Sequence, residues 1–215
     1  MVGVPKIKLS GMKPGTRICL RFAEVKYLDL PEYKGNTGMI MLENIRAVMA
    51  QDIYIAKGGE ETIFPRFTYH GYRFVEITGI DEPLPAASVK GVVLSSIHEL
   101  VSRYETSDEK VNKLWENITW SSFANFMSIP TDCPQRNERL GWAGDISVFS
   151  RTATYLADVP QFLRRYLRSM RDVQREDGRF PDIAPLGGGF GGLLWGSAGI
   201  TVPWECYLQY GDKVL

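Results

Sequence analysis

The spacing of apolar residues changes its period near Thr106, and this change constrains the fold more than any other feature. Upstream of it, Ile18, Leu20 and Phe22 alternate with Arg17, Cys19 and Arg21. Such an alternation is typical of a strand with one buried face. Further β-branched and aromatic runs (DIYIAK, TIFPRFTYH, YRFVEITGI) are separated by turn sequences (MKPG, YKGNTG, KGGEE, HGY). This pattern predicts an antiparallel β-sandwich domain over residues 1–103.

Downstream of Thr106 the apolar residues follow a helical period. The first helix is predicted from Val111, Leu114, Trp115 and Ile118, with Thr106 and Glu109 as its capping box. Three more helices are predicted. The second covers about 145–157, the third begins at Pro160 with Asp158 as its cap, and the fourth runs from about 197 to just before Gly211. Helices joined by short loops pack as hairpins, so residues 104–215 are predicted to form a helical-hairpin domain.

Composition excludes several classes of protein. Lys and Arg together number 25, as do Asp and Glu, so the chain lacks the basic excess of a sequence-independent nucleic-acid binder. Its three cysteines and two histidines show neither a disulfide framework nor zinc-ligand spacing. Residues 183–204 carry no charge but contain seven glycines and two prolines. We interpret them as a glycine-rich loop running into a helix and not as a membrane span.

The segment TDCPQRNERLGWAGD, residues 131–145, concentrates reactive side chains between the first two helices. It supplies the carboxylates Asp132, Glu138 and Asp145. Cleavage of a glycosidic bond needs a carboxylic acid at the leaving oxygen, and a sugar ring packs its C–H face on an aromatic side chain such as Trp142. The same residues also fit a solvated loop with surface ion pairs, in which Trp142 belongs to the core. The residue types alone leave both interpretations open.

The run SIPTDCPQRNERLGWAGD closely resembles the signature of bacterial α-L-rhamnosidases, glycoside hydrolase family 78. PRFTYHGYRFVEITG, QREDGRFPDIAP and LLWGSAGITVPWECYLQYGD resemble the same family, in the same order. The resemblance implies β-sandwich domains followed by a catalytic (α/α)6 barrel. It also implies that terminal non-reducing α-L-rhamnose is hydrolysed with inversion.

The resemblance also implies roles for six residues. Glu138 matches the general acid, and Asp132 and Asp145 match carboxylates that bind rhamnose hydroxyls. Arg136 and Trp142 match residues that line the sugar pocket, and Trp195 matches a second aromatic wall. The chain has Ser197 where the family commonly has aspartate, so one polar contact near Trp195 differs. No metal and no organic cofactor is implied.

The length available for the barrel is short. Twelve helices of ~12 residues with loops of ~4 residues need roughly 190 residues, and 110 remain from Thr106 onward. We therefore expect a fragment that holds the first half of the barrel and begins inside a β domain. Its general base, a glutamate, would lie in the absent half, so the fragment alone would be inactive. The alternative is a non-catalytic remnant that at most binds rhamnosides.

The remaining expectations concern partners and location. We expect a rhamnose-containing glycoside or polysaccharide as substrate, and neither nucleic acid nor membrane as a partner. The N-terminal sequence MVGVPKIKLSG lacks an apolar signal-peptide core, which favours the cytoplasm. The sequence predicts neither the aglycone nor the oligomeric state.

Overall fold

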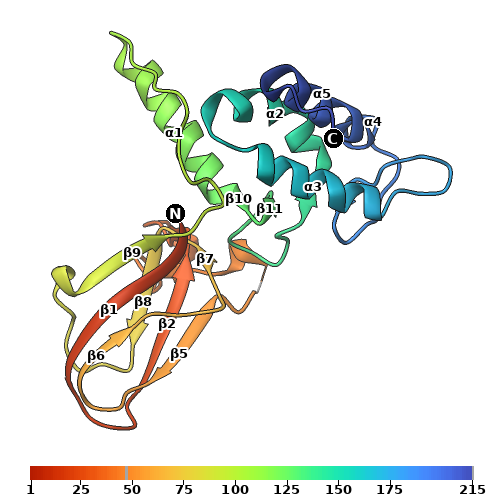
Figure 1. Cartoon of the computed structure of the whole chain (residues 1–215). Helices are drawn as coiled ribbons and strands as arrows, with labels where there is room; N and C mark the ends of the chain where they lie inside the picture. The colour runs from red at the N-terminus through yellow and green to blue at the C-terminus, as the bar shows by residue number, and fades with distance from the viewer. Residues whose placement is uncertain (47, 215) are drawn as a thin grey trace. The chain divides into compact units, whose positions relative to one another are not determined.

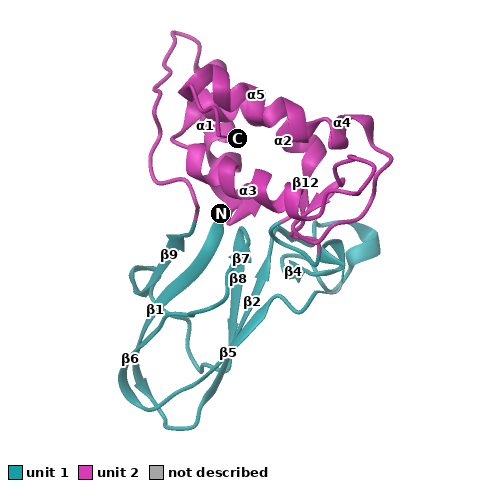
Figure 2. Cartoon of the chain, turned by 45° about the vertical axis from the view of Figure 1, so that its right-hand side comes forward, with its two compact units in different colours: residues 1–94, 134–137 teal, residues 95–133, 138–215 magenta. Residues whose placement is uncertain are grey.

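The computed structural model describes residues 1–46 and 48–214, and the chain divides into two compact units (Figure 2). Met1–Leu94 with Pro134–Asn137 form the β unit, and Ser95–Cys133 with Glu138–Leu215 form the helical unit. The division lies before the boundary predicted at 103–104. The backbone N–H of Ser96 donates to the carbonyl of Phe126 over 2.7 Å. This hydrogen bond holds the start of the segment 95–103 within the helical unit.

Two antiparallel sheets make up most of the β unit (Figure 1). The first contains β1 (Val2–Met12), β6 (Gly59–Ile63), β7 (His70–Gly71) and β9 (Val89–Val93), and the second contains β2 (Arg17–Ala23), β5 (Gln51–Ile55) and β8 (Phe74–Thr78). A short ladder pairs β3 (Val25–Lys26) with β4 (Ile40–Met41), and single 3₁₀ turns cover Pro31–Tyr33, Glu43–Ile45 and Ala86–Ser88. The expected antiparallel β structure is therefore present.

The core of the β unit lies between its two sheets. Ile7 and Leu9 of β1 and Ile18, Leu20 and Phe22 of β2 are each at most 1% exposed and belong to one apolar cluster. The alternation in the sequence therefore predicted the buried faces of these strands correctly. Apolar burial of this kind is the main stabilising contribution to a sheet packed on a sheet.

In the described part of the helical unit, up to residue 214, the chain forms five helices and two short strand pairs. The helices are α1 (Glu109–Asn125), α2 (Ala143–Leu156), α3 (Pro160–Asp172), α4 (Leu193–Gly196) and α5 (Ala198–Tyr210). β10 (Phe126–Met127) pairs with β11 (Ile129–Pro130), and β12 (Gly141–Trp142) pairs with β13 (Ile183–Ala184). A glycine-rich loop joins β13 to α4, as predicted for this uncharged stretch. Among the described residues, no helix is long and apolar enough to cross a membrane.

Most of the helical core comes from α2, α3 and α5, and Ile97, Phe126 and Ala184 add to it. Helix α5 packs against both α2 and α3. The predicted apolar stripe of α3 is buried throughout: Phe162, Leu163, Tyr166, Leu167 and Met170. On α1 the predicted stripe is less covered, since Leu114 is 58% exposed.

Two predicted helix caps are wrong. Helix α1 is capped by Asp108, whose carboxylate accepts from the Lys110 N–H over 2.8 Å. The Thr106 hydroxyl does not cap the helix but donates to the Asp108 carbonyl and to the side-chain oxygen of Asn112. Helix α3 has Val159 at its N-cap and no side-chain cap, and the proline at its first position needs no N–H acceptor. Short polar side chains can satisfy several neighbouring N–H groups, so spacing alone did not select the cap.

Candidate active site

The segment 131–145 runs from a β-bridge into helix α2, and its end is held by two short strands. Gly141 pairs with Ala184, and the Tyr166 hydroxyl donates to the Gly141 carbonyl over 2.9 Å. A Cβ atom at position 141 would lie 2.2 Å from the Ala184 carbonyl oxygen, so only glycine allows this approach. The contacts fix the backbone at Trp142, directly before α2. Burial raises the pKa of Tyr166, which keeps its hydroxyl available as a donor.

Two predicted carboxylates meet inside this segment. The side chains of Asp132 and Glu138 are hydrogen-bonded, and with the Cys133 thiol their ligand atoms all lie within 4.8 Å of one another. A hydrogen bond between two carboxyls requires that they share a proton. The pKa of Asp132 is raised by burial and by the hydrogen bond to Glu138. The pair therefore retains a proton at higher pH than an isolated carboxyl.

Trp142 contacts this carboxyl pair directly. Its indole N–H donates to Oε1 of Glu138 over 3.1 Å, so Glu138 is bonded to both Trp142 and Asp132. Arg139, which follows Glu138 in the chain, has a left-handed backbone with φ 47°. A non-glycine residue in this region carries strain of about 1–2 kcal/mol. The strained backbone at Arg139 lowers the stability of the folded loop, and such strain is common at functional sites.

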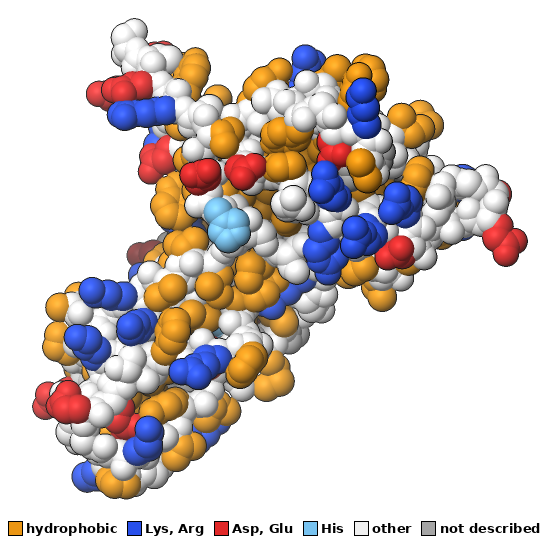
Figure 3. Space-filling view, viewed as in Figure 1, with side chains coloured by type: hydrophobic (Ala, Val, Ile, Leu, Met, Phe, Trp, Pro, Cys, Tyr) orange, Lys and Arg blue, Asp and Glu red, His pale blue; other side chains and the backbone are white. Residues whose placement is uncertain are grey.

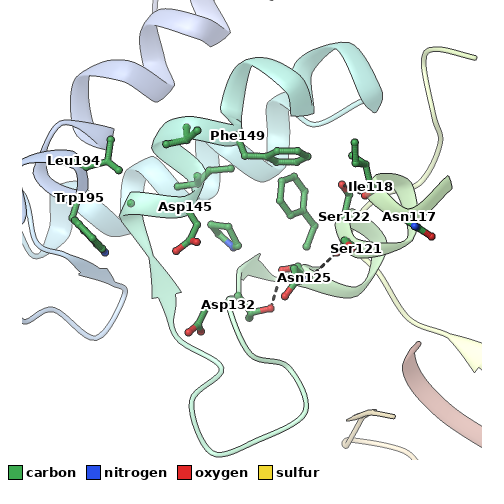
Figure 4. A pocket seen from close by; sticks show the side chains of 16 residues that line it. Asn117, Ile118, Ser121, Ser122, Asn125, Asp132, Asp145, Phe149, Leu194 and Trp195 are labelled. Atoms are coloured by element: carbon green, nitrogen blue, oxygen red, sulfur yellow. Dashed lines mark hydrogen bonds between the residues drawn. The ribbon is translucent and has the colours of Figure 1, made fainter. Parts of the chain in front are cut away.

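A pocket of about 710 Å³ lies beside the pair, within the helical unit. Its wall contains Asp132, Asp145 of α2 and Trp195 of α4, three of the predicted site residues. The other lining residues are Asn117, Ile118, Ser121, Ser122, Asn125, Phe126, Pro130, Thr131, Gly144, Ile146, Val148, Phe149 and Leu194. Figure 4 shows Trp195 and Asp145 at one end of the pocket and Asn117 at the other.

Trp195 depends on glycines for its position. A Cβ atom at Gly144 or at Gly192 would lie 2.7 or 2.6 Å from a carbon atom of the Trp195 indole. The indole therefore packs directly on backbone at both positions. Its Nε1 atom is buried and has no acceptor among the described residues. Asp145 lies in the first turn of α2, where the helix dipole favours its negative charge.

The structure brings together five of the six predicted residues within the helical unit. Asp132, Asp145 and Trp195 line the pocket, Glu138 bonds to Asp132, and Trp142 bonds to Glu138. Arg136 belongs to Pro134–Asn137, which groups with the β unit. The roles assigned to all six residues stay predictions.

The sequence interpretation missed the contribution of α1 to the pocket. Asn117, Ser121 and Asn125 line it at intervals of four residues, and Asn125 donates from Nδ2 to the Ser121 carbonyl over 2.8 Å. This polar row at helical spacing was visible in the sequence. Without the fold, however, it reads as the solvent face of an amphipathic helix.

The Asp132, Cys133 and Glu138 cluster has the atom types and spacing of a metal-ligand set. A cation there would need both carboxylates ionised, and it would displace the proton of their mutual hydrogen bond.

A β domain followed by helical hairpins, with paired carboxyls beside a tryptophan-walled pocket, is the arrangement of a glycoside hydrolase. The chain belongs to the bacterial α-L-rhamnosidases. Residues 1–95 match the model of the bacterial alpha-L-rhamnosidase concanavalin-like domain, and residues 99–215 match the model of the six-hairpin glycosidase domain of the same family.

Individual relatives extend over nearly the whole chain. An alpha-L-rhamnosidase of Streptomyces avermitilis is 45% identical over 99% of this chain and 20% of its own length. An alpha-L-rhamnosidase of Alteromonas sp. is 40% identical over 99% of this chain and 23% of its own length. The chain therefore spans only about a fifth of the curated relatives that it matches.

Solved structures show the same likeness. The crystal structure of the Streptomyces avermitilis alpha-L-rhamnosidase complexed with L-rhamnose has a TM-score of 0.88 at 46% identity, over 99% of this chain and 20% of that one. The alpha-L-rhamnosidase from Dictyoglumus thermophilum has a TM-score of 0.89 at 39% identity, over 99% and 24% of the two chains.

Proposed function

We propose that the chain supplies the acid side of an inverting α-L-rhamnosidase that removes terminal non-reducing α-L-rhamnose from rhamnosides. Glu138 donates to the glycosidic oxygen the proton that it shares with Asp132, and the bond breaks as this proton is transferred. Asp132 and Asp145 accept hydrogen bonds from rhamnose hydroxyls, and Arg136, Trp142 and Trp195 line the sugar site. The reaction needs no metal and no organic cofactor, because protonation and water attack use side chains alone.

The hydrogen bond between Asp132 and Glu138 supports this proposal most strongly. A general acid must hold a proton near neutral pH, and two carboxyls that share a proton give it up less readily than separate ones. Asp132 lines the pocket while bonded to Glu138. The shared proton therefore lies next to the place where a sugar would bind.

Two further parts of the proposal rest on the family. The helices α1, α2, α3 and α5 would form the first half of an (α/α)6 barrel. The general base, which activates water on the opposite sugar face, would lie outside these 215 residues. We accordingly expect the 215-residue chain alone to be inactive on aryl α-L-rhamnosides, whereas turnover near that of a complete enzyme would contradict this expectation.

A second candidate function is rhamnoside binding without hydrolysis. It is favoured by the pocket itself, because Asp145 and Trp195 in its wall can hold a sugar without any proton transfer. In that case the pocket would retain sugar affinity, and no extension of the chain would restore turnover.

The test is Glu138→Gln in the full-length enzyme, measured on rhamnosides of graded leaving-group pKa. General acid assistance contributes about 10²–10⁴-fold, and it matters most where the departing oxygen is basic. We therefore expect a loss of that size for poor leaving groups and a much smaller loss for activated aryl rhamnosides.

The matched control is Glu176→Gln, which makes the same chemical change at an exposed turn outside the pocket. We expect this variant to keep the parent's activity on every substrate. The assignment of Glu138 is wrong if Glu138→Gln lowers all rates equally, or if Asp132→Asn or Asp145→Asn shows the graded effect instead.

A further inference from the structure

Basic side chains gather over helix α3, as Figure 3 shows on the face of the molecule that it displays. The residues are Arg164, Arg165, Arg168 and Arg171. Arg164, Arg168 and Arg171 are spaced by four and three residues and so share one side of the helix. Like charges at this spacing destabilise a helix, and the net charge of the whole chain is zero. The excess is therefore local and is not explained by composition.

Two hollows adjoin this arginine face, and Arg164 and Arg168 line both. The smaller one, of about 110 Å³, is lined by Arg164, Leu167, Arg168, Arg171, Phe180, Gly199, Pro203 and Val214. The larger one, of about 300 Å³, is lined by Gln161, Arg164, Arg165, Arg168, Ser169 and Asp172. A ligand in either hollow would contact guanidinium groups on more than one turn of the helix.

The four guanidinium groups differ in how many hydrogen bonds and ion pairs they form within the chain. Arg164 forms an ion pair with Asp212, but its Nε–H is buried and lacks an acceptor among the described residues. Arg165 donates to the Ser169 hydroxyl over 3.0 Å. Arg168 and Arg171 are exposed and form no side-chain hydrogen bond or ion pair with residues 1–46 or 48–214. These two arginines therefore keep donors available for an anion.

The smaller hollow combines these donors with apolar surface. Leu167, Phe180 and Pro203 contribute to its wall beside Arg168 and Arg171. The Phe180 ring packs on the backbone at Gly199, where a Cβ atom would lie 2.2 Å from a ring carbon, so the ring is fixed. Guanidinium binds carboxylates and other oxyanions in bidentate geometry, and aromatic rings pack against the C–H faces of sugars.

We propose that the arginine face of α3 is a binding site for the oxyanion of an acidic saccharide, a carboxylate or a sulfate ester. Nucleic acid is less suited, because binding its phosphate backbone draws on a basic excess that this chain lacks. The site goes beyond the proposed hydrolysis and does not depend on it. The competing explanation is a solvated basic face in which Arg171 merely stabilises the C-terminal end of α3.

The experiment measures binding of the full-length enzyme to polygalacturonate, dextran sulfate, neutral dextran and duplex DNA at one fixed ionic strength. The double variant Arg168→Ala/Arg171→Ala is compared with Arg103→Ala/Lys110→Ala, which removes the same charge from exposed positions off the arginine face. The single variant Arg168→Lys keeps the charge but loses the bidentate geometry.

We expect binding to polygalacturonate or dextran sulfate but not to dextran. We expect it to weaken at least about tenfold in Arg168→Ala/Arg171→Ala, a loss typical of one strong charge-assisted contact, and to stay at the parent level in the control. Preference between the two polymers identifies carboxylate or sulfate as the ligand. Equal losses in both double variants, unchanged binding by Arg168→Lys, tighter binding to DNA, or no binding to either polymer would each overturn the proposal.

Hydrolysis is measured separately, on a neutral aryl rhamnoside with the full-length enzyme. The arginine variants should leave its rate unchanged, because none of these arginines lines the pocket beside Asp132. Failure of the proposed function would therefore appear in this assay alone, and failure of the arginine site in the binding assay alone.

Discussion

Asp52 in the β unit and Asp132 in the helical unit are both partly buried carboxylates, yet they have opposite kinds of partner. Both oxygens of Asp52 lie 3.1 Å from Nε2 of His70, a donor. Asp132 instead bonds to Glu138, a second acid. A complementary partner lowers the free-energy cost of burying a charge, whereas a second acid raises it unless a proton is held between them.

The surroundings of the two carboxylates agree with this difference. His70 belongs to the sheet of β1 and Asp52 to the sheet of β2, so their bond links the two layers across the core. The His70 ring also stacks on Phe22 at 3.8 Å. Asp132 faces a pocket. A buried polar pair that joins sheets indicates a structural role, whereas two acids that share a proton beside a pocket indicate chemistry.

The largest change in stability is expected for His70→Phe. Phenylalanine fills similar space beside Phe22 but leaves Asp52, whose side chain is 19% exposed, without its donor. A lost hydrogen bond to a charged group costs about 1.5–3 kcal/mol. The free energy of unfolding in urea measures this. Asp52→Asn, which still accepts from His70, should cost much less, and equal losses would break the structural half of the comparison.

An intermediate loss of stability is expected for Tyr166→Phe, which removes a neutral buried hydroxyl. The Tyr166 hydroxyl donates to the Gly141 carbonyl, and its removal takes this hydrogen bond out of the core. We expect a loss of about 1–2 kcal/mol in the free energy of unfolding. Tyr155→Phe, at a tyrosine 54% exposed on α2, is the control and should change stability by less than about 0.5 kcal/mol.

The sequence predicted those parts of the molecule that follow from local pattern. The alternation in β2 and the helical stripe of α3 correspond to the buried faces, because burial of apolar surface decides which side of an element faces inward. The wrong caps at Thr106 and Asp158 lie where several polar side chains compete for the same N–H groups.

The candidate site was predictable in its residue types but not in its contacts. The sequence predicts that Asp132 and Glu138 belong to one site. Only the folded loop shows that they bond to each other and that Trp142 donates to Glu138. The grouping of Arg136 with the β unit and the polar row of α1 in the pocket also depend on chain packing. Neither follows from spacing along the chain.

The smallest change in stability, and one of opposite sign, is expected for Asp132→Asn. The pKa of Asp132 is raised in the folded state, so folding binds its proton more tightly. The stability that this proton contributes is full below the ordinary carboxyl pKa of about 3.9 and is lost as the pH rises through the raised value. Asparagine does not titrate and keeps a donor for Glu138 at every pH.

Asp132→Asn should therefore gain stability relative to the parent as the pH rises above about 4, the ordinary carboxyl pKa, although its activity falls. Urea unfolding at several pH values measures the trend. Asp177→Asn provides the reverse case, because the Arg179 guanidinium lowers the pKa of exposed Asp177. This variant should lose stability relative to the parent as the pH rises toward about 4, the ordinary carboxyl pKa, and change little above it. If Asp132→Asn followed the trend of Asp177→Asn, Asp132 would be an ordinary stabilising carboxylate, and the contrast with Asp52 would disappear.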